Sequence, residues 1–426
     1  ILIIRNCLLD GEHTTTREVF FMKKLIHMAL WKQILIGIVA GILVGVYAPG
    51  VVPHIKFLGD IFLRLLKMLI APLVLFTLIS GVCKMGDIKR LYTVGIRIVC
   101  YYLITSAVSA ALGLLFALFT QPGKGVTDLL TSESGKTVSY DFLSNMIQWI
   151  PTNIFESLAK GDTLQIIIFA LLTGIVLLLL GDECAGVVKL IDQAANVMLK
   201  MTDLVMKYSP IGIFALIADM MTTISGRMLY QVVNFIATDW AVCLVVIFII
   251  QPLLVQFLGR LSAIQYLKNV APIMVVAAST TSSAATLPLE LKIANEKMGI
   301  PENIYGFCLP LGNTCNMNGM ACGIGVISVF ASNLFGVPIT IGACVQFIFL
   351  GLVLSVGAAG VKGAGIVMSS VLLQTVGMPL TLVPLLAAVW PILDIVHTTA
   401  NVSGDMAGTI IVARSLDSLD VEKFNS

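Results

Sequence analysis

Long apolar segments dominate this chain and decide what it can fold into. A helix crosses a bilayer with about 20 consecutive apolar residues, and helices satisfy their backbone hydrogen bonds without help from water. More diffuse apolar stretches follow residue 270, and clear runs lie at 34–48, 56–82, 92–120, 166–181, 203–221 and 232–258. The sequence therefore predicts an all-α polytopic membrane protein.

Composition and charge fit this class. Hydrophobic residues make up 58% of the chain and charged residues only 12%, far from the usual composition of soluble domains. The net charge of +2 gives no indication of a nucleic-acid partner. The basic residues beside the predicted spans are Lys23, Lys24, Lys32, Lys84, Lys89, Arg90, Arg97, Arg260 and Lys268. By the positive-inside rule they predict a cytoplasmic N-terminus.

Two later stretches are too polar for lipid contact and too apolar for loops. Residues 271–288 (APIMVVAASTTSSAATLP) are dense in Ser, Thr and Ala, and the stretch from Gly351 to Ser370 contains GAAGVKGAG, whose glycines would break a helix. Irregular backbone at membrane depth is tolerated only where it is buried in protein or lines a cavity. Both stretches are therefore predicted to be re-entrant hairpins.

Each predicted hairpin precedes a span that carries polar residues. The first is followed by NTCNMNG at 313–319, and the second by a stripe of Asp394, Thr398, Asn401 and Asp405. Their spacing of three or four residues places the stripe on one helix face, and an intramembrane carboxylate is a functional hypothesis by default. The pattern indicates an inverted repeat of hairpin plus interrupted helix, with a substrate site between the halves.

Six segments resemble the dicarboxylate/amino acid:cation symporter family, which includes the glutamate transporters. The similarity runs from about Lys32 to Arg414. Its segments are LRLLKMLIAPLVLFTLISG at 63–81, YYLITSA at 101–107, SPIGIFALIA at 209–218, TSSAATLP at 281–288, PLGNTCNMNG at 310–319 and LDIVHTTANVSGDMAGTIIVA at 393–413. The resemblance implies a glutamate-transporter-like fold of eight transmembrane helices and two re-entrant hairpins, assembled as a homotrimer and working by an elevator mechanism.

The resemblance also implies how the chain divides. Residues 1–31 would be a cytoplasmic segment, in which 1–21 look like an upstream artefact before Met22. Residues 32–269 would form N-terminal helices for scaffold and trimer contacts, with part of the transport domain. Residues 270–414 would form the transport core, with two hairpins and two interrupted helices, and 415–426 a cytoplasmic tail.

An amino-acid substrate site is implied by the same motifs. Asp394 resembles the family aspartate that binds the substrate ammonium, and Ser283 with neighbouring hairpin N–H groups matches the position that binds the α-carboxylate. Thr398 and Asn401 resemble further contacts. Simpler interpretations stay open, because Asp394 could pair with His397 one turn away and Thr398 could bond within its own turn.

Sodium is the implied coupling ion, with the proton as the alternative. Hard cations take carboxylate, carbonyl and hydroxyl oxygens. One implied site combines Asp405 and Asn401 with backbone carbonyls near Gly312 and Asn316, and a second combines side chains from 102–106 with Asn316 and position 318. The metal-ligating candidates are Tyr102, Thr105, Ser106, Gly312, Thr314, Asn316, Asn318, Asn401 and Asp405.

Three positions in these motifs depart from the family pattern. NMNGM stands where the family usually has NMDGT, so Asn318 replaces an aspartate and Met320 a threonine. The lost charge weakens the second cation site and predicts fewer coupled sodium ions. Lys362 stands in the second hairpin where proline is common. Its ammonium either supplies charge near a sodium ion or snorkels to the extracellular surface.

Substrate class depends on His397. Members that carry acidic substrates have an arginine there, which clamps a carboxylate bidentately. A histidine ring is not permanently charged and cannot bind a carboxylate bidentately as a guanidinium does. Met320, in place of threonine, removes a further polar contact from the candidate pocket. We therefore expect a neutral amino acid, or a longer and more polarisable one. The alternative is an acidic substrate held weakly through His397 and water.

Other classes of protein fit less well. Ser283 and His397 are a conceivable hydrolase pair, but no G-x-S-x-G motif surrounds the serine. A channel would need a continuous polar pore, whereas the polar residues cluster at one depth. The nine cysteines show no metal-ligand spacing and are predicted to pack in the core. The sequence thus predicts a multi-pass symporter of the bacterial plasma membrane, not an enzyme, with proton-coupled glutamate, aspartate or dicarboxylate symport as the alternative.

Overall fold

The computed structural model describes residues 30–84, 92–126, 147, 150–222, 226–357 and 364–425, and every regular element in them is a helix. The predicted all-α class is confirmed. The predictions for residues 1–29 and for Lys362 lie outside the described residues. Short terminal and connecting helices are η1 (Pro49–Val51), α7 (Ile154–Lys160), η3 (Gly181–Cys184), η5 (Leu380–Leu382) and α19 (Val421–Asn425).

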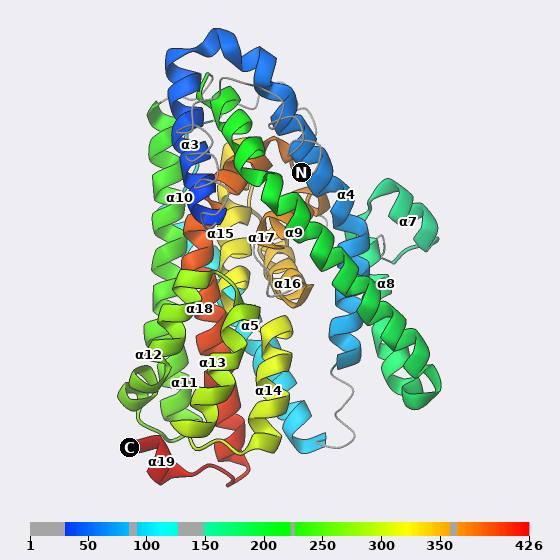
Figure 1. The fold of residues 1–426 in the computed structure, drawn as a ribbon, viewed down its shortest axis with the longest axis vertical. Helices are drawn as coiled ribbons and strands as arrows, with labels where there is room; N and C mark the ends of the chain where they lie inside the picture. Colours follow the sequence, from blue (N-terminus) through cyan, green and yellow to red (C-terminus); the bar gives the residue numbers. More distant parts are fainter. Residues whose placement is uncertain are drawn as a thin grey trace, which may run out of the picture.

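The long helices pack in two groups (Figure 1). The first group pairs early helices with one another, and α9 crosses both α3 and α4. Residues 32–47 and 49–62 meet at a bend of 105° between α3 and α4. Its members are α3 (Leu30–Tyr47), α4 (Val52–Lys84), α8 (Thr163–Leu180) and α9 (Ala185–Met221).

The second group surrounds α15 and α18, which pack against each other and against α5 and α10. A π-helical turn, η4 (Val246–Ile250), separates α10 from α11. The members are α5 (Tyr92–Thr120), α10 (Gly226–Val245), α11 (Gln251–Phe257), α12 (Ala263–Thr280), α13 (Ser283–Glu296), α14 (Glu302–Cys315), α15 (Asn318–Phe335), α16 (Ile341–Gly357), α17 (Ala364–Thr375) and α18 (Val383–Ser415).

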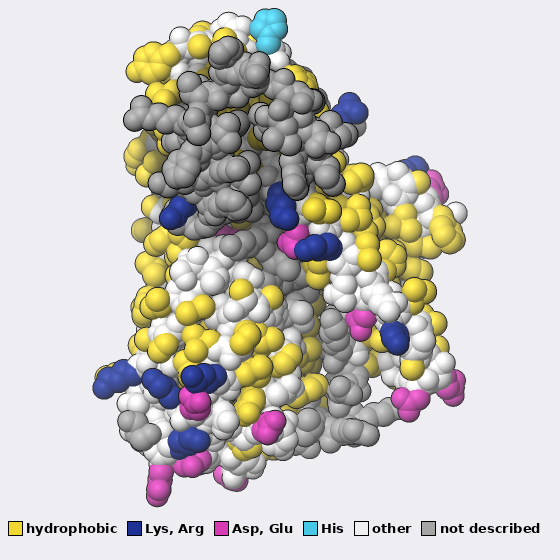
Figure 2. All heavy atoms as spheres, in the orientation of Figure 1, with side chains coloured by type: hydrophobic (Ala, Val, Ile, Leu, Met, Phe, Trp, Pro, Cys, Tyr) yellow, Lys and Arg dark blue, Asp and Glu magenta, His cyan; other side chains and the backbone are white. Residues whose placement is uncertain are grey.

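Length and hydropathy qualify five of the described helical segments as membrane spans, or six with the bent α3–α4 pair. The predicted count of eight therefore stays a prediction. Of the apolar window in α14–α15, 94% is buried, against 28% for the segment 165–205. The former thus lies inside the protein, and the latter offers an apolar face to lipid. Charged side chains gather at the end of the molecule near α12 and α19 (Figure 2).

A helical hairpin occurs where the sequence predicts the first one, and helices lie on both sides of the predicted second tip. Helices α12 and α13 pack against each other across a two-residue tip, in which Thr281 adopts φ +49° and the side chain of Ser282 accepts a hydrogen bond from the N–H of Ala285. Helices α16 and α17 also contact each other. Whether either hairpin enters and leaves the membrane on one side stays a prediction.

One of the two predicted helix interruptions is present. Helices α14 and α15 are separated at Asn316 and Met317, whose backbones are not helical. The second interruption is wrong, because α18 runs unbroken through Pro391 and the polar stripe. Its hydroxyls donate to carbonyls one turn back, as from Thr399 to Ile395 and from Thr409 to Asp405. Such bonds satisfy polar side chains without breaking the helix.

Candidate functional site

The break between α14 and α15 lies against the middle of α18. The side-chain oxygen of Asn401 accepts a hydrogen bond from the N–H of Gly319 at 2.8 Å, and its amide nitrogen lies 3.1 Å from the sulfur of Met317. Gly319 is required here, because a Cβ would stand 2.4 Å from the backbone of His397. The two polar motifs of the sequence therefore form one site.

Asp405 is the buried carboxyl group of this site. It is 0% exposed, and one of its oxygens accepts a hydrogen bond from the amide of Asn316 at 2.8 Å. Its other oxygen has no hydrogen-bond partner within the described residues. A Cβ at Gly312 would stand 2.5 Å from the Asp405 carboxylate and 2.6 Å from the hydroxyl of Tyr102. The glycine thus lets both side chains reach the backbone of α14.

The second predicted cation group is also brought together, by α5 and the helix break. Thr105 donates a hydrogen bond to the side-chain oxygen of Asn316 at 3.3 Å, and Ser106 donates to that of Asn318 at 3.4 Å. All four residues are buried. The oxygens of these side chains are neutral. This group can therefore bind a cation through dipoles only, without a formal negative charge.

Two predicted ligands donate their hydroxyl hydrogens to backbone carbonyls. The hydroxyl of Tyr102 donates to the carbonyl of Cys308 at 2.9 Å, and the hydroxyl of Thr314 donates to the carbonyl of Leu311 at 3.0 Å in its own helix. The Tyr102 oxygen also lies near Asp405 at Gly312. The structure thus places Tyr102 beside the Asp405 site and gives Thr314 a bond within its own turn.

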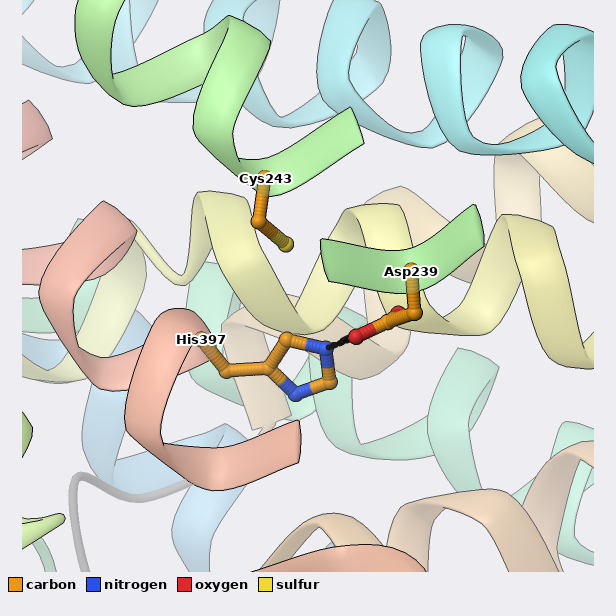
Figure 3. Close-up of side chains that lie close together, drawn as sticks. All are labelled: Asp239, Cys243 and His397. Carbon is orange, nitrogen blue, oxygen red and sulfur yellow. Dashed lines mark hydrogen bonds and ion pairs between the residues drawn. The ribbon is translucent and has the colours of Figure 1, made fainter. Parts of the chain in front are cut away.

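His397 pairs with a residue that the sequence analysis missed. Its Nε2 lies 2.8 Å and 3.0 Å from the two carboxylate oxygens of Asp239 on α10 (Figure 3). Both side chains are buried, with relative exposures of 2% and 0%. The sequence does contain a feature that marks Asp239. It is an acidic residue inside the apolar run 232–258, and acidic residues in such runs are functional candidates. The sequence left open a pair between His397 and Asp394. In the structure, the Nε2 atom of His397 contacts Asp239 instead.

The ring of His397 is held on three sides. Gly323 on α15 leaves it room, since a Cβ there would stand 2.7 Å from the ring. Trp390 packs edge-on at a centroid distance of 5.4 Å. The Nδ1 of His397 and the Nε1 of Trp390 are both buried without a hydrogen-bond partner among the described residues.

Cys243 is the third member of this cluster. The ligand atoms of Asp239, Cys243 and His397 all lie within 4.8 Å of one another (Figure 3). Nitrogen, sulfur and oxygen donors of this kind suit a transition metal such as zinc. The direct contact of His397 with Asp239 at 2.8 Å accounts for the pair as a hydrogen bond, so the cluster gives no reason to assign a metal.

The remaining predicted substrate residues lie on α13, α15 and α18. Ser283 is the first residue of α13, Met320 is in the first turn of α15, and Thr398 is on α18; all three are buried. Asp394 is half-buried on α18, one turn before His397. Helices α13 and α15 both pack against α18, and a shared substrate site for these four side chains stays a prediction.

We expect Asp239→Asn to lower the free energy of unfolding by about 2 kcal/mol, because it weakens a buried hydrogen bond to the His397 ring that the carboxylate makes with both oxygens. Denaturant titration of the purified protein in detergent measures this change. Asp203→Asn is the control, since its 4.0 Å contact with Lys200 is exposed and such pairs contribute little. Equal effects of the two substitutions would contradict this view of Asp239.

Comparison with known proteins places the chain in a family. The model of the sodium:dicarboxylate symporter family matches residues 30–415. A proton/sodium-glutamate symport protein of Geobacillus stearothermophilus is 30% identical over 394 residues, which cover 90% of this chain and 93% of that protein. A proton/glutamate-aspartate symporter of Escherichia coli K12 is 30% identical (94% and 96% covered), and a C4-dicarboxylate transport protein of Bacillus subtilis is 28% identical (92% and 94% covered). The chain therefore belongs to the sodium:dicarboxylate symporter family, and it is a multi-pass membrane protein that performs cation-coupled symport rather than an enzyme.

Proposed function

We propose that this chain is a sodium-coupled symporter of a neutral amino acid. The observation that carries the proposal is the pair of His397 and Asp239. With Asp239 ionised, the pair is neutral when the ring is protonated and negative when it is not. An acidic substrate side chain therefore meets no net positive charge at the position where acidic-substrate members of the family carry an arginine.

The backbone half of an amino acid fits the other polar groups. Asp394 supplies a carboxylate for the substrate ammonium. The first turn of α13, at Ser283, provides the positive end of a helix dipole, which favours a carboxylate. The orphan nitrogens of His397 and Trp390 favour a polar, uncharged side chain between them.

Transport through an elevator movement is part of the proposal. The first helix group (α3, α4, α8 and α9) packs mainly on itself, and the site residues all lie in the second group. This division supports a scaffold and a moving domain. By the family resemblance we propose a homotrimer in a bacterial plasma membrane, with both termini in the cytoplasm.

The alternative is proton-coupled symport of glutamate, aspartate or a dicarboxylate, and the names of the relatives favour it. Uptake into proteoliposomes of a panel of labelled amino acids and C4-dicarboxylates, with sodium and proton gradients imposed separately, tests both. Concentrative uptake of a neutral amino acid under the sodium gradient is the expected result. A preference for aspartate above about tenfold, or about 1.4 kcal/mol, would contradict the proposed substrate class.

Selectivity should change only when the anionic partner of position 397 is removed as well. His397→Arg combined with Asp239→Asn is expected to shift preference towards aspartate by about tenfold or more, because a bidentate guanidinium becomes available to a substrate carboxylate. His397→Arg alone should shift it less, since Asp239 would bind the new guanidinium. Competition of unlabelled substrates in the uptake assay measures both. Equal shifts in the two variants would show that Asp239 does not control this position.

A further inference from the structure

Glu290 is a buried carboxylate to which neither the sequence motifs nor the substrate site assign a role. It lies on α13 and is 0% exposed. Neither of its oxygens has a hydrogen-bond partner in the described part of the chain. An ionised carboxylate in this position is costly without a counter-charge, and a protonated one would leave its O–H unpaired. A bound cation would resolve both difficulties.

The nearest basic residue of the same helix does not fill this role. Lys292 lies two positions further along α13, and its ammonium is 3.9 Å from Glu296. The side chains of that pair are 62% and 58% exposed, so they lie at the surface. Residues two apart on a helix also point in different directions. The buried and exposed acids of α13 therefore have different surroundings.

Glu290 lies on a helix that packs against both of the helices around Asp405. Helix α13 packs against α14 and α18, and the Glu290 carboxyl group is within electrostatic range of Asp405. The second oxygen of Asp405 is buried without a hydrogen-bond partner among the described residues, and so is the hydroxyl of Tyr101, which is also within range of Asp405. Glu290, Asp405 and Tyr101 are thus three buried groups with unused oxygen atoms on helices of the second group.

We propose that Glu290 supplies the second negative charge of a cation site centred on Asp405, and that the cation is sodium. The inference rests on the sodium coupling proposed above. Hard cations prefer oxygen ligands, and a charge acts on a cation more strongly than a neutral dipole does in a low-dielectric site. Glu290 reaches the site from α13, whereas Asn318 on α15 provides only an uncharged oxygen.

Sodium binding without substrate tests this role directly. The thermal unfolding temperature of the purified protein in detergent is measured against NaCl, with choline chloride keeping the ionic strength constant. We expect the half-effective sodium concentration to rise about tenfold or more in Glu290→Gln, because one charge at the site is lost. Glu296→Gln, which removes an exposed acid from the same helix, should leave it unchanged. An unchanged value in Glu290→Gln would overturn the inference.

A second variant covers the case in which Glu290→Gln does not fold. Glu290→Asp keeps the charge on a side chain one methylene shorter, and its half-effective sodium concentration should stay within about threefold of the wild type. Loss of the sodium response in a folded Glu290→Asp would contradict a role based on charge.

Uptake by the wild type separates this inference from the proposed function. If the wild type shows sodium-driven uptake and Glu290→Gln has the same sodium dependence, the role of Glu290 is overturned while the proposed sodium coupling stands. A wild type that responds to a proton gradient and shows neither sodium-driven uptake nor sodium stabilisation would contradict the proposed coupling ion, and this inference with it.

Discussion

Asp394→Asn is expected to abolish amino-acid uptake and to weaken binding by at least about 100-fold, or about 2.7 kcal/mol. The asparagine side chain has nearly the same shape but no charge, so the substrate ammonium would be desolvated without a counter-ion. Asp394 is only half-buried, so its replacement should not disturb the core. Equilibrium binding of labelled substrate in saturating sodium measures the loss.

The exposed acid Asp203 again provides the control for Asp394. Asp203→Asn should bind and transport as the wild type does, and both variants should elute from size exclusion at the same volume as the wild type. Binding by Asp394→Asn within about threefold of the wild type, less than 1 kcal/mol, would remove Asp394 from the substrate site.

Asp405→Asn is expected to eliminate sodium-driven uptake. The new side-chain oxygen can still accept the hydrogen bond from Asn316 that the structure shows at 2.8 Å, so the main change is the loss of charge beside the cation. A single negative charge stabilises a buried cation far more than an amide dipole does. Uptake measured at a series of sodium concentrations should show no sodium activation up to about 100 mM, roughly 100-fold above a requirement of about 1 mM.

Asn318→Ala is the matched comparison for Asp405→Asn. Asn318 contributes only a neutral oxygen, which accepts from Ser106 at 3.4 Å, so its loss should raise the sodium requirement by less than about fivefold, within 1 kcal/mol. A separate measurement concerns the wild type. Its coupling ratio, measured in liposomes at a series of clamped membrane potentials, should be below three sodium ions per substrate. Unchanged uptake in Asp405→Asn, or a ratio of three, would show that the count of carboxylates does not predict coupling here.

Local sequence patterns determined most of the secondary structure. The predicted spans agree with the helices of the structure, as at 92–120 and α5 (Tyr92–Thr120), because a long apolar run in lipid has few alternatives to a helix. The break at Asn316 and Met317 was also readable. The second predicted break is absent, because hydrogen bonds from Thr399 and Thr409 to carbonyls one turn back let α18 continue. A polar stripe alone does not distinguish a broken helix from a continuous one.

Only the tertiary structure decided which charges share a site. The sequence marks Asp405 and Asn316 as candidates through their motifs, and the structure joins them across 89 positions. It also brings Asp239 to His397 across 158 positions. Helix periodicity reports neighbours three or four residues apart, whereas these pairs form because α10 and α15 pack around α18. The sequence therefore determined the family motifs, and helix packing decided the electrostatics of the site.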